Sequence, residues 1–120
     1  MGQTQNVQFC SYLINGMDDK NLENRIAAIK SSGMIGCSEA TVKLHSKIDP
    51  TNDNQERLAA IISLGLLKKP SSIEYLLTIL NDEEPNLRWD SAVSLCKLKN
   101  KEGYPLLKKL LNRKYYLNYK

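Results

Sequence analysis

The chain has 120 residues, of which 42% are hydrophobic and 25% are charged, and its formal net charge is +4. This composition is ordinary for one soluble globular domain, so disorder is not expected, and no apolar run approaches the roughly 20 residues that a membrane-spanning helix needs. The first ten residues lack the basic start and apolar run of a signal peptide, so we predict a cytoplasmic protein with no membrane contact.

The first predicted element, over residues 7–15, is a single helix that corresponds to the second half of a repeat unit. Three predicted helix pairs and a basic, tyrosine-rich tail follow it, over residues 20–48, 52–80, 84–112 and 113–120. We predict one domain over 1–120, an all-α solenoid of antiparallel helix pairs with about three and a half repeats and about seven helices.

The first helices of the three units share one pattern. It begins at Arg25, Arg57 and Arg88, which are 32 and 31 residues apart (57 − 25 and 88 − 57). Small or apolar residues follow at three and four positions after each arginine and lie on one helical face. A fixed period in this range predicts a repeat array. Gly33 and Gly65 are predicted to end their helices, because glycine adopts a left-handed backbone at low strain.

The second helices repeat as well. Leu44, Leu76 and Leu107 are also 32 and 31 residues apart (76 − 44 and 107 − 76). An i, i+3, i+4, i+7 stripe of apolar residues runs from 73 to 80, and such a stripe must be buried. The segment 70–72 before it, Pro-Ser-Ser, predicts a helix start in which serine caps free N–H groups.

The pattern resembles HEAT repeats, in particular the short bacterial HEAT-like repeats that also occur in phycobilin lyase subunits. The resemblance covers about residues 7–112, and its most specific stretch is 82–95. It implies that Asp and Arg side chains stabilise the stack by bonding between loops and neighbouring helices; here they are Asp19, Arg25, Arg57, Asp82 and Arg88. These Asp–Arg contacts would form a ladder along the stack. Because Thr51 stands where the middle unit would have its aspartate, the ladder is not expected at Arg57.

The resemblance also implies that second helices line the concave side of the array. The positions there that the core stripe leaves free are Lys43, Lys47, Glu74, Tyr75, Thr78, Lys108 and Lys109. We predict that this face binds a protein partner. Residues 91–120 carry eight basic groups against Glu102 alone, so an acidic partner is favoured at the C-terminal end.

No catalytic, cofactor or metal motif is present, so we predict that the protein is not an enzyme and needs no cofactor. The three cysteines, Cys10, Cys37 and Cys96, have no CxxC spacing and are predicted to be reduced, buried thiols. His45, the only histidine, is predicted to be structural. Trp89 is predicted to be packed, although an exposed tryptophan would be a partner-binding anchor.

Other functions stay open. Tyrosines alternate with basic residues in the tail 113–120, a mixture that suits nucleic-acid binding, although the tail can equally cover the outer apolar edge of the last unit. A second chain could supply that cover by self-association. The resemblance to lyase subunits suggests an accessory role in bilin attachment, and a purely structural piece of a longer array is the remaining alternative.

Overall fold

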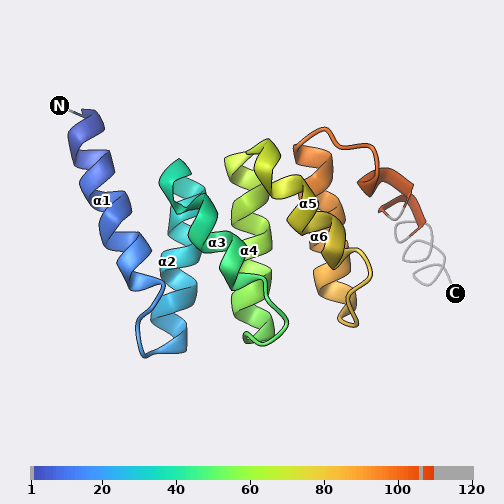
Figure 1. Ribbon diagram of the computed structural model, residues 1–120, viewed down its shortest axis with the longest axis horizontal. Coiled ribbons are helices and arrows are strands. Elements are labelled where there is room, and N and C mark those ends of the chain that lie inside the picture. Colours follow the sequence, from blue (N-terminus) through green and yellow to red (C-terminus); the bar gives the residue numbers. More distant parts are fainter. Residues whose placement is uncertain (1, 106, 110–120) are drawn as a thin grey trace, which may run out of the picture.

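The computed structural model describes residues 2–105 and 107–109, with side chains from residue 8 onward. Every regular element within them is a helix (Figure 1). The elements are α1 (Gly2–Gly16), α2 (Leu22–Ile35), η1 (Ser38–Ala40), α3 (Thr41–Lys47), α4 (Asn54–Leu67), η2 (Pro70–Ser72), α5 (Ile73–Ile79) and α6 (Pro85–Lys97). Residues 103–105 and 107–109 are helical too. The predicted all-α helical solenoid is confirmed.

The helices stack in two layers. α2, α4 and α6 stand side by side in one row, and the short helices α3 and α5 lie in front of that row (Figure 1). Each first helix packs on the next, α2 on α4 and α4 on α6, while α3 packs on α4 and α5 on α6. α1 packs on α2 in the same manner. It therefore takes the place of a second helix, while the repeat bounds of this segment stay a prediction.

Side-chain caps begin two of the first helices, and left-handed residues end them. Asn21 accepts a hydrogen bond from the backbone N–H of Asn24 at the start of α2, and Asp53 caps α4 in the same way. α2 ends at Gly36, with φ 88°, and α4 ends at Lys68, with φ 55°. The prediction that Gly33 and Gly65 end these helices is therefore wrong, because both lie one turn earlier, within the helices.

These two glycines instead let the first helices approach closely. A Cβ atom on Gly33 would lie 2.6 Å from Cα of Ser63, and one on Gly65 would lie 3.0 Å from Cα of Ser94. The hydroxyl of Ser63 donates to the backbone carbonyl of Ile29 on α2 at 2.7 Å. Ser94 makes the equivalent bond to α4 at 2.9 Å. Each serine thus satisfies its buried hydroxyl on the neighbouring helix.

The stripe on the second helices is buried only in part. Leu44 and Leu76 are fully buried, whereas Ile73, Leu77 and Leu80 are half-buried. α5 has only seven residues, so one buried leucine and Ile79 anchor it to α6. Half-buried flanking positions leave apolar surface at the outer side of the second-helix layer.

A disulfide joins Cys10 of α1 to Cys37, which precedes η1. Their Cα atoms are 5.6 Å apart, a usual separation for a disulfide. The prediction of reduced thiols is wrong for this pair, because the packing of α1 brings together residues that have no spacing signature. Cys96 is free and half-buried, and burial raises the pKa of its thiol.

The disulfide closes a loop across 27 residues, which stabilises the folded chain by about 3–4 kcal/mol in the chain-entropy account, because it restricts the unfolded state. Disulfides persist in oxidising compartments, so this bond does not support the cytoplasmic location, which stays a prediction. No helix within the described residues has both the length and the apolar character needed to cross a membrane.

Candidate functional site

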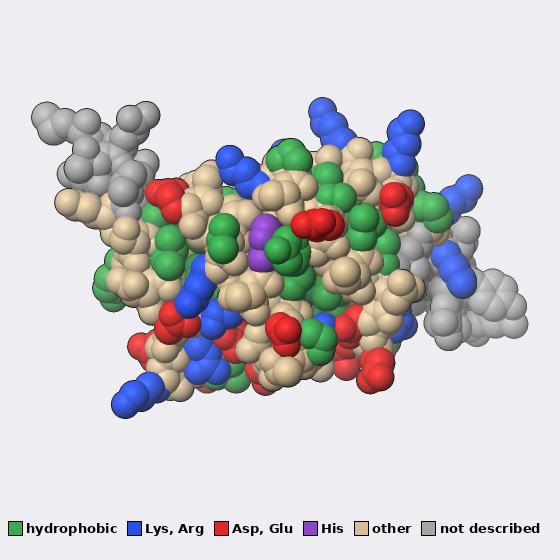
Figure 2. Space-filling model, viewed as in Figure 1, with side chains coloured by type: hydrophobic (Ala, Val, Ile, Leu, Met, Phe, Trp, Pro, Cys, Tyr) green, Lys and Arg blue, Asp and Glu red, His purple; other side chains and the backbone are tan. Residues whose placement is uncertain are grey.

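A groove of about 820 Å³ lies between α3 and α5, on the face of the second helices. The side chains that line it come from both helices and from the loop 49–52, and they include His45, Ile48, Tyr75, Thr78 and Ile79. Figure 2 shows this face, with the histidine near its centre and charged side chains along its lower edge. The groove joins two successive repeat units.

Two stacked rings stand at the mouth of the groove. The rings of His45 and Tyr75 are 3.9 Å apart between centroids and inclined by 13°. Nε2 of His45 lies 2.8 Å from Oγ of Ser72, so the serine predicted to cap α5 holds the histidine instead. Desolvation lowers the pKa of His45, although the charge of Glu74 opposes it. The imidazole is therefore mainly neutral at pH 7, and the stack is a neutral aromatic pair.

An ion pair between units also lines the groove. Nη2 of Arg57 on α4 lies 2.5 Å from Oδ2 of Asp82, in the loop before α6. Nε of the same guanidinium donates to the carbonyl of Ile48 at 3.0 Å. The hydrogen bond from Arg57 holds the pKa of Asp82 below its usual range. The expectation that the ladder breaks at Arg57 is wrong, because its carboxylate comes from the following unit.

The other arginines of the repeat bond to the loops before their own helices. Nη1 of Arg25 donates to the backbone carbonyl of Asp19 at 2.9 Å, and Nη1 of Arg88 donates to that of Asp82 at 2.6 Å. Arg25 also pairs with Glu56 of the next unit, from Nε to Oε2 at 3.2 Å. The six-residue spacing thus brings loop and helix together through backbone carbonyls, and the acid partners of Arg25 and Arg57 come from the next unit.

A family model for HEAT repeats matches residues 41–117, which is more than half of the chain. The chain belongs to the HEAT-repeat family. HEAT repeats in general mediate protein–protein interaction. A search of the curated proteins gave no match.

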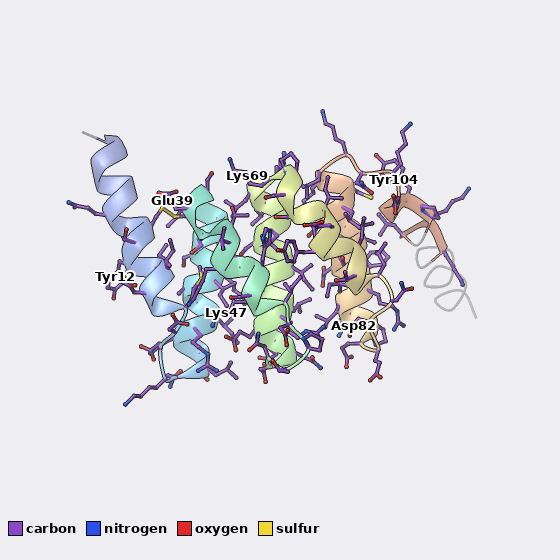
Figure 3. All side chains as sticks on the ribbon, in the orientation of Figure 1. Tyr12, Glu39, Lys47, Lys69, Asp82 and Tyr104 are labelled. Carbon is purple, nitrogen blue, oxygen red and sulfur yellow. A yellow bond between two sulfur atoms is a disulfide. The ribbon has the colours of Figure 1, made fainter. Side chains whose placement is uncertain are left out.

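One residue predicted for the partner-binding face of this HEAT array is not available there. Lys47 is buried, with Nζ 2.6 Å from the carbonyl of Met17 and 3.1 Å from Oε2 of Glu56 (Figure 3). Its prediction as a free surface residue is therefore wrong. Buried charges need partners, and Lys47 links α3 to α4 and to the loop after α1. Lys43, one turn earlier, is partly exposed and pairs with Asp18 at 2.5 Å.

The remaining predicted residues divide between two places on the HEAT array. Tyr75 and Thr78 line the groove, and Glu74 is exposed beside them. Lys108 and Lys109 are exposed in the last described segment and do not line the groove. The tail 113–120, on which the nucleic-acid alternative and the cover for the last unit rest, lies outside the described residues.

Two further aromatic residues do not line the groove. Tyr12 on α1 is 72% exposed and occupies the place of Lys43 and Tyr75 on the later second helices, 31 and 63 residues earlier (43 − 12 and 75 − 12). Sequence reasoning missed it, although the repeat period contains the signal. Trp89 on α6 is half-buried, between the packed and exposed alternatives.

Proposed function

We propose that this HEAT array is a non-catalytic interaction module that binds a segment of a partner protein in the groove between α3 and α5. The observation that carries the proposal is the exposed ring of Tyr75 at the mouth of a groove of about 820 Å³. Tyr75 is 38% exposed, although its other face is stacked on His45. Partly exposed aromatic rings over a hollow are typical anchors of protein interfaces.

The stack and its hydrogen bond favour binding because they hold the anchor in place before a partner arrives. Tyr75 is fixed by His45, and His45 is fixed by Ser72. Binding then loses little side-chain entropy, which is one of the main costs of association. Thr78 and the loop 49–52 add polar groups beside the rings. Such a site suits a peptide segment that offers one apolar side chain between polar backbone groups.

The charge of the partner is a separate part of the proposal. Near the groove, Glu74 and Asp49 are exposed, and Lys43 is paired with Asp18. An acidic partner would therefore meet Lys108 and Lys109 rather than the groove itself. Both lysines are exposed beyond α6. The partner would extend from the groove toward that end of the array.

The test compares Tyr75→Ala with Phe9→Ala, a matched control because Phe9 is an aromatic residue that is 48% exposed on α1, away from the groove and from Lys108 and Lys109. Each variant and the original chain are used to capture proteins from native cells, and captured proteins are then purified and titrated. We expect Tyr75→Ala to weaken binding at least about tenfold, as for an aromatic anchor worth about 1.4 kcal/mol or more, and Phe9→Ala to leave it unchanged. Equal affinity of the two variants for every purified partner contradicts the proposal.

A further inference from the structure

α2 is the first helix of its repeat unit. One face of α2 is uncovered, whereas the corresponding face of the later first helices is covered. α2 packs against α4, and the covered face of α4 carries Ala59 and Ser63, each 1% exposed. Ala27 and Ser31 hold the same places on α2, 32 residues earlier (59 − 27 and 63 − 31). There Ala27 is exposed and Ser31 is half-buried. α1 packs on α2 as α3 packs on α4, and among the residues whose side chains are described none buries Ala27.

This face borders a hollow of about 310 Å³. Tyr12 and Gly16 line it from α1, and Asn24, Ala28 and Ser31 line it from α2. Gly16 lies so close to α2 that a Cβ atom there would be 3.2 Å from Cβ of Ala28. The hollow is thus the space between a second helix and the position where a preceding first helix would lie.

The two internal junctions show what a helix in this position must offer. At each of them, a serine in the place of Ser31 stands over a glycine that lies eight residues after an arginine (33 − 25 and 65 − 57). The glycine is required because a Cβ atom at Gly33 would lie 2.6 Å from the backbone of Ser63. The occupant therefore needs glycine at the position that faces Ser31.

A carboxylate for the arginine of such a helix is also present. Asp19 precedes Arg25 by six residues, as Asp82 precedes Arg88, and Asp82 accepts the arginine of the preceding unit. Asp19 is exposed beside the hollow, and its Oδ1 accepts from the backbone N–H of Asn21 at 2.8 Å. That hydrogen bond lowers the pKa of Asp19, so the group is charged at neutral pH.

The geometry points to a second interaction surface: the hollow between α1 and α2 binds one helix of a partner chain that carries an arginine and, eight residues later, a glycine. A second copy of this chain does not fit in this register. Its last described first helix, α6, has Arg88 but carries Cys96 where the glycine is needed. The cysteine side chain would occupy the space next to Ser31. This surface is separate from the groove at Tyr75.

The test uses the whole chain and a fluorescent peptide with the sequence of residues 53–68, which carries Arg57 and Gly65 in the required spacing. We expect saturable binding in fluorescence anisotropy. Ser31→Leu in the protein should weaken it at least about tenfold, because leucine fills the point of closest approach. Ser71→Leu, which adds the same side chain at an exposed serine of η2, should leave it unchanged.

Two further variants test the roles of the glycine in the peptide and of the carboxylate in the protein. A peptide with Gly65→Val should lose binding, and Asp19→Asn in the protein should weaken binding about threefold or more and reduce its salt dependence. Tyr75→Ala should have no effect, so failure here is independent of the proposed groove. The inference is overturned by absent binding, by equal binding to the Ser31→Leu and Ser71→Leu proteins, or by a dimer in sedimentation that Ser31→Leu abolishes. Circular dichroism confirms that each variant is folded.

Discussion

The two junctions between neighbouring first helices share one close contact and differ in their charges. At both, a serine hydroxyl donates to a backbone carbonyl of the preceding helix beside a glycine. Between α2 and α4, Glu56 accepts from Arg25 and from Lys47. Between α4 and α6, Asp82 accepts from Arg57. Glu56 lies on a helix and pairs with two cationic side chains, whereas Asp82 lies in a loop and pairs with one.

The difference shows which part of the repeat sets the register of the stack. At the serine–glycine contact, the backbone of one first helix lies against a serine of the next, and the contact recurs after 31 residues (94 − 63). The distance between neighbouring first helices can therefore vary little. Arginine and lysine side chains are long and reach acids at different positions, so the charges adapt to a spacing that the close contact determines. Stability should then depend on charge at one junction more than at the other, and on glycine at both.

The largest expected effect is the loss of the shared acid. Glu56→Gln should lower the free energy of unfolding by about 3 kcal/mol, because Arg25 and the buried Lys47 both lose the charge of the acid that they share. Asp82→Asn should cost about 1–2 kcal/mol, since Arg57 keeps its bond to Ile48 and the asparagine keeps an oxygen. Urea unfolding measures both. Glu39→Gln, at an exposed acid, is the control and should be neutral. Equal costs of the two changes would show that the charges at the junctions are equivalent.

A smaller effect is expected from the glycines. Alanine is a better helix former than glycine by about 1 kcal/mol, so Gly33→Ala and Gly65→Ala would stabilise the array if the close contact were unimportant. We expect both to destabilise it by about 1–3 kcal/mol, because the added Cβ meets the next helix. Thermal and urea unfolding measure this change. Lys30→Ala, on the exposed side of α2, serves as the control.

A serine-to-glycine substitution, combined with each glycine-to-alanine substitution, tests whether the two close contacts differ. A Cβ atom on Gly65 meets mainly the side chain of Ser94, with Cβ at 2.8 Å and Cα at 3.0 Å, whereas one on Gly33 meets Cα of Ser63 at 2.6 Å. Ser94→Gly should therefore remove most of the cost of Gly65→Ala. Ser63→Gly should remove less of the cost of Gly33→Ala, because the backbone contact remains. Similar rescue at both junctions would contradict this account.

The fold was predictable because the period alone orders the helices. Arginines 32 and 31 residues apart, with small residues at fixed offsets, specify a stack whatever the surface carries. The roles of Gly33 and Gly65 were not predictable in the same way. Glycine near the end of a helical pattern suits both a left-handed end and a close contact, and only the position of the next helix decides between them.

The candidate site was less predictable, because its contacts join residues of different units. Arg57 finds Asp82 at a separation of 25 residues, and Arg25 finds Glu56 at 31. Neither pair follows the six-residue spacing within a unit. Lys47 looks like a free lysine in the sequence, yet the turn after α1 and the start of α4 enclose it. Tyr75 was identified from the pattern, but its stack on His45 depends on how two units pack.

The smallest effect concerns acid stability. Arg57 depresses the pKa of Asp82 in the folded protein from its ordinary value of 3.8. The stabilisation is then complete above the unfolded pKa, and it is lost as the pH falls below about 4 and through the folded pKa. The difference in unfolding free energy between the original chain and Asp82→Asn should therefore be constant near neutral pH and shrink below pH 4. Urea unfolding at several pH values measures this difference.

Asp18→Asn gives the comparison at an ion pair outside these junctions, between the loop after α1 and α3. The hydrogen bond from Lys43 lowers the pKa of Asp18 as well, but its side chain is 60% exposed, so solvent screens the pair and the pH-dependent part should be smaller. Asp18, Asp19 and Asp49 still titrate in Asp82→Asn, so this variant also loses stability in acid, over a smaller range. An Asp82→Asn curve parallel to that of the original chain down to pH 2 would mean that pairing with Arg57 does not lower the folded pKa of Asp82. The ion pair at the α4–α6 junction would then be a consequence of the close contact between the helices and would not stabilise it.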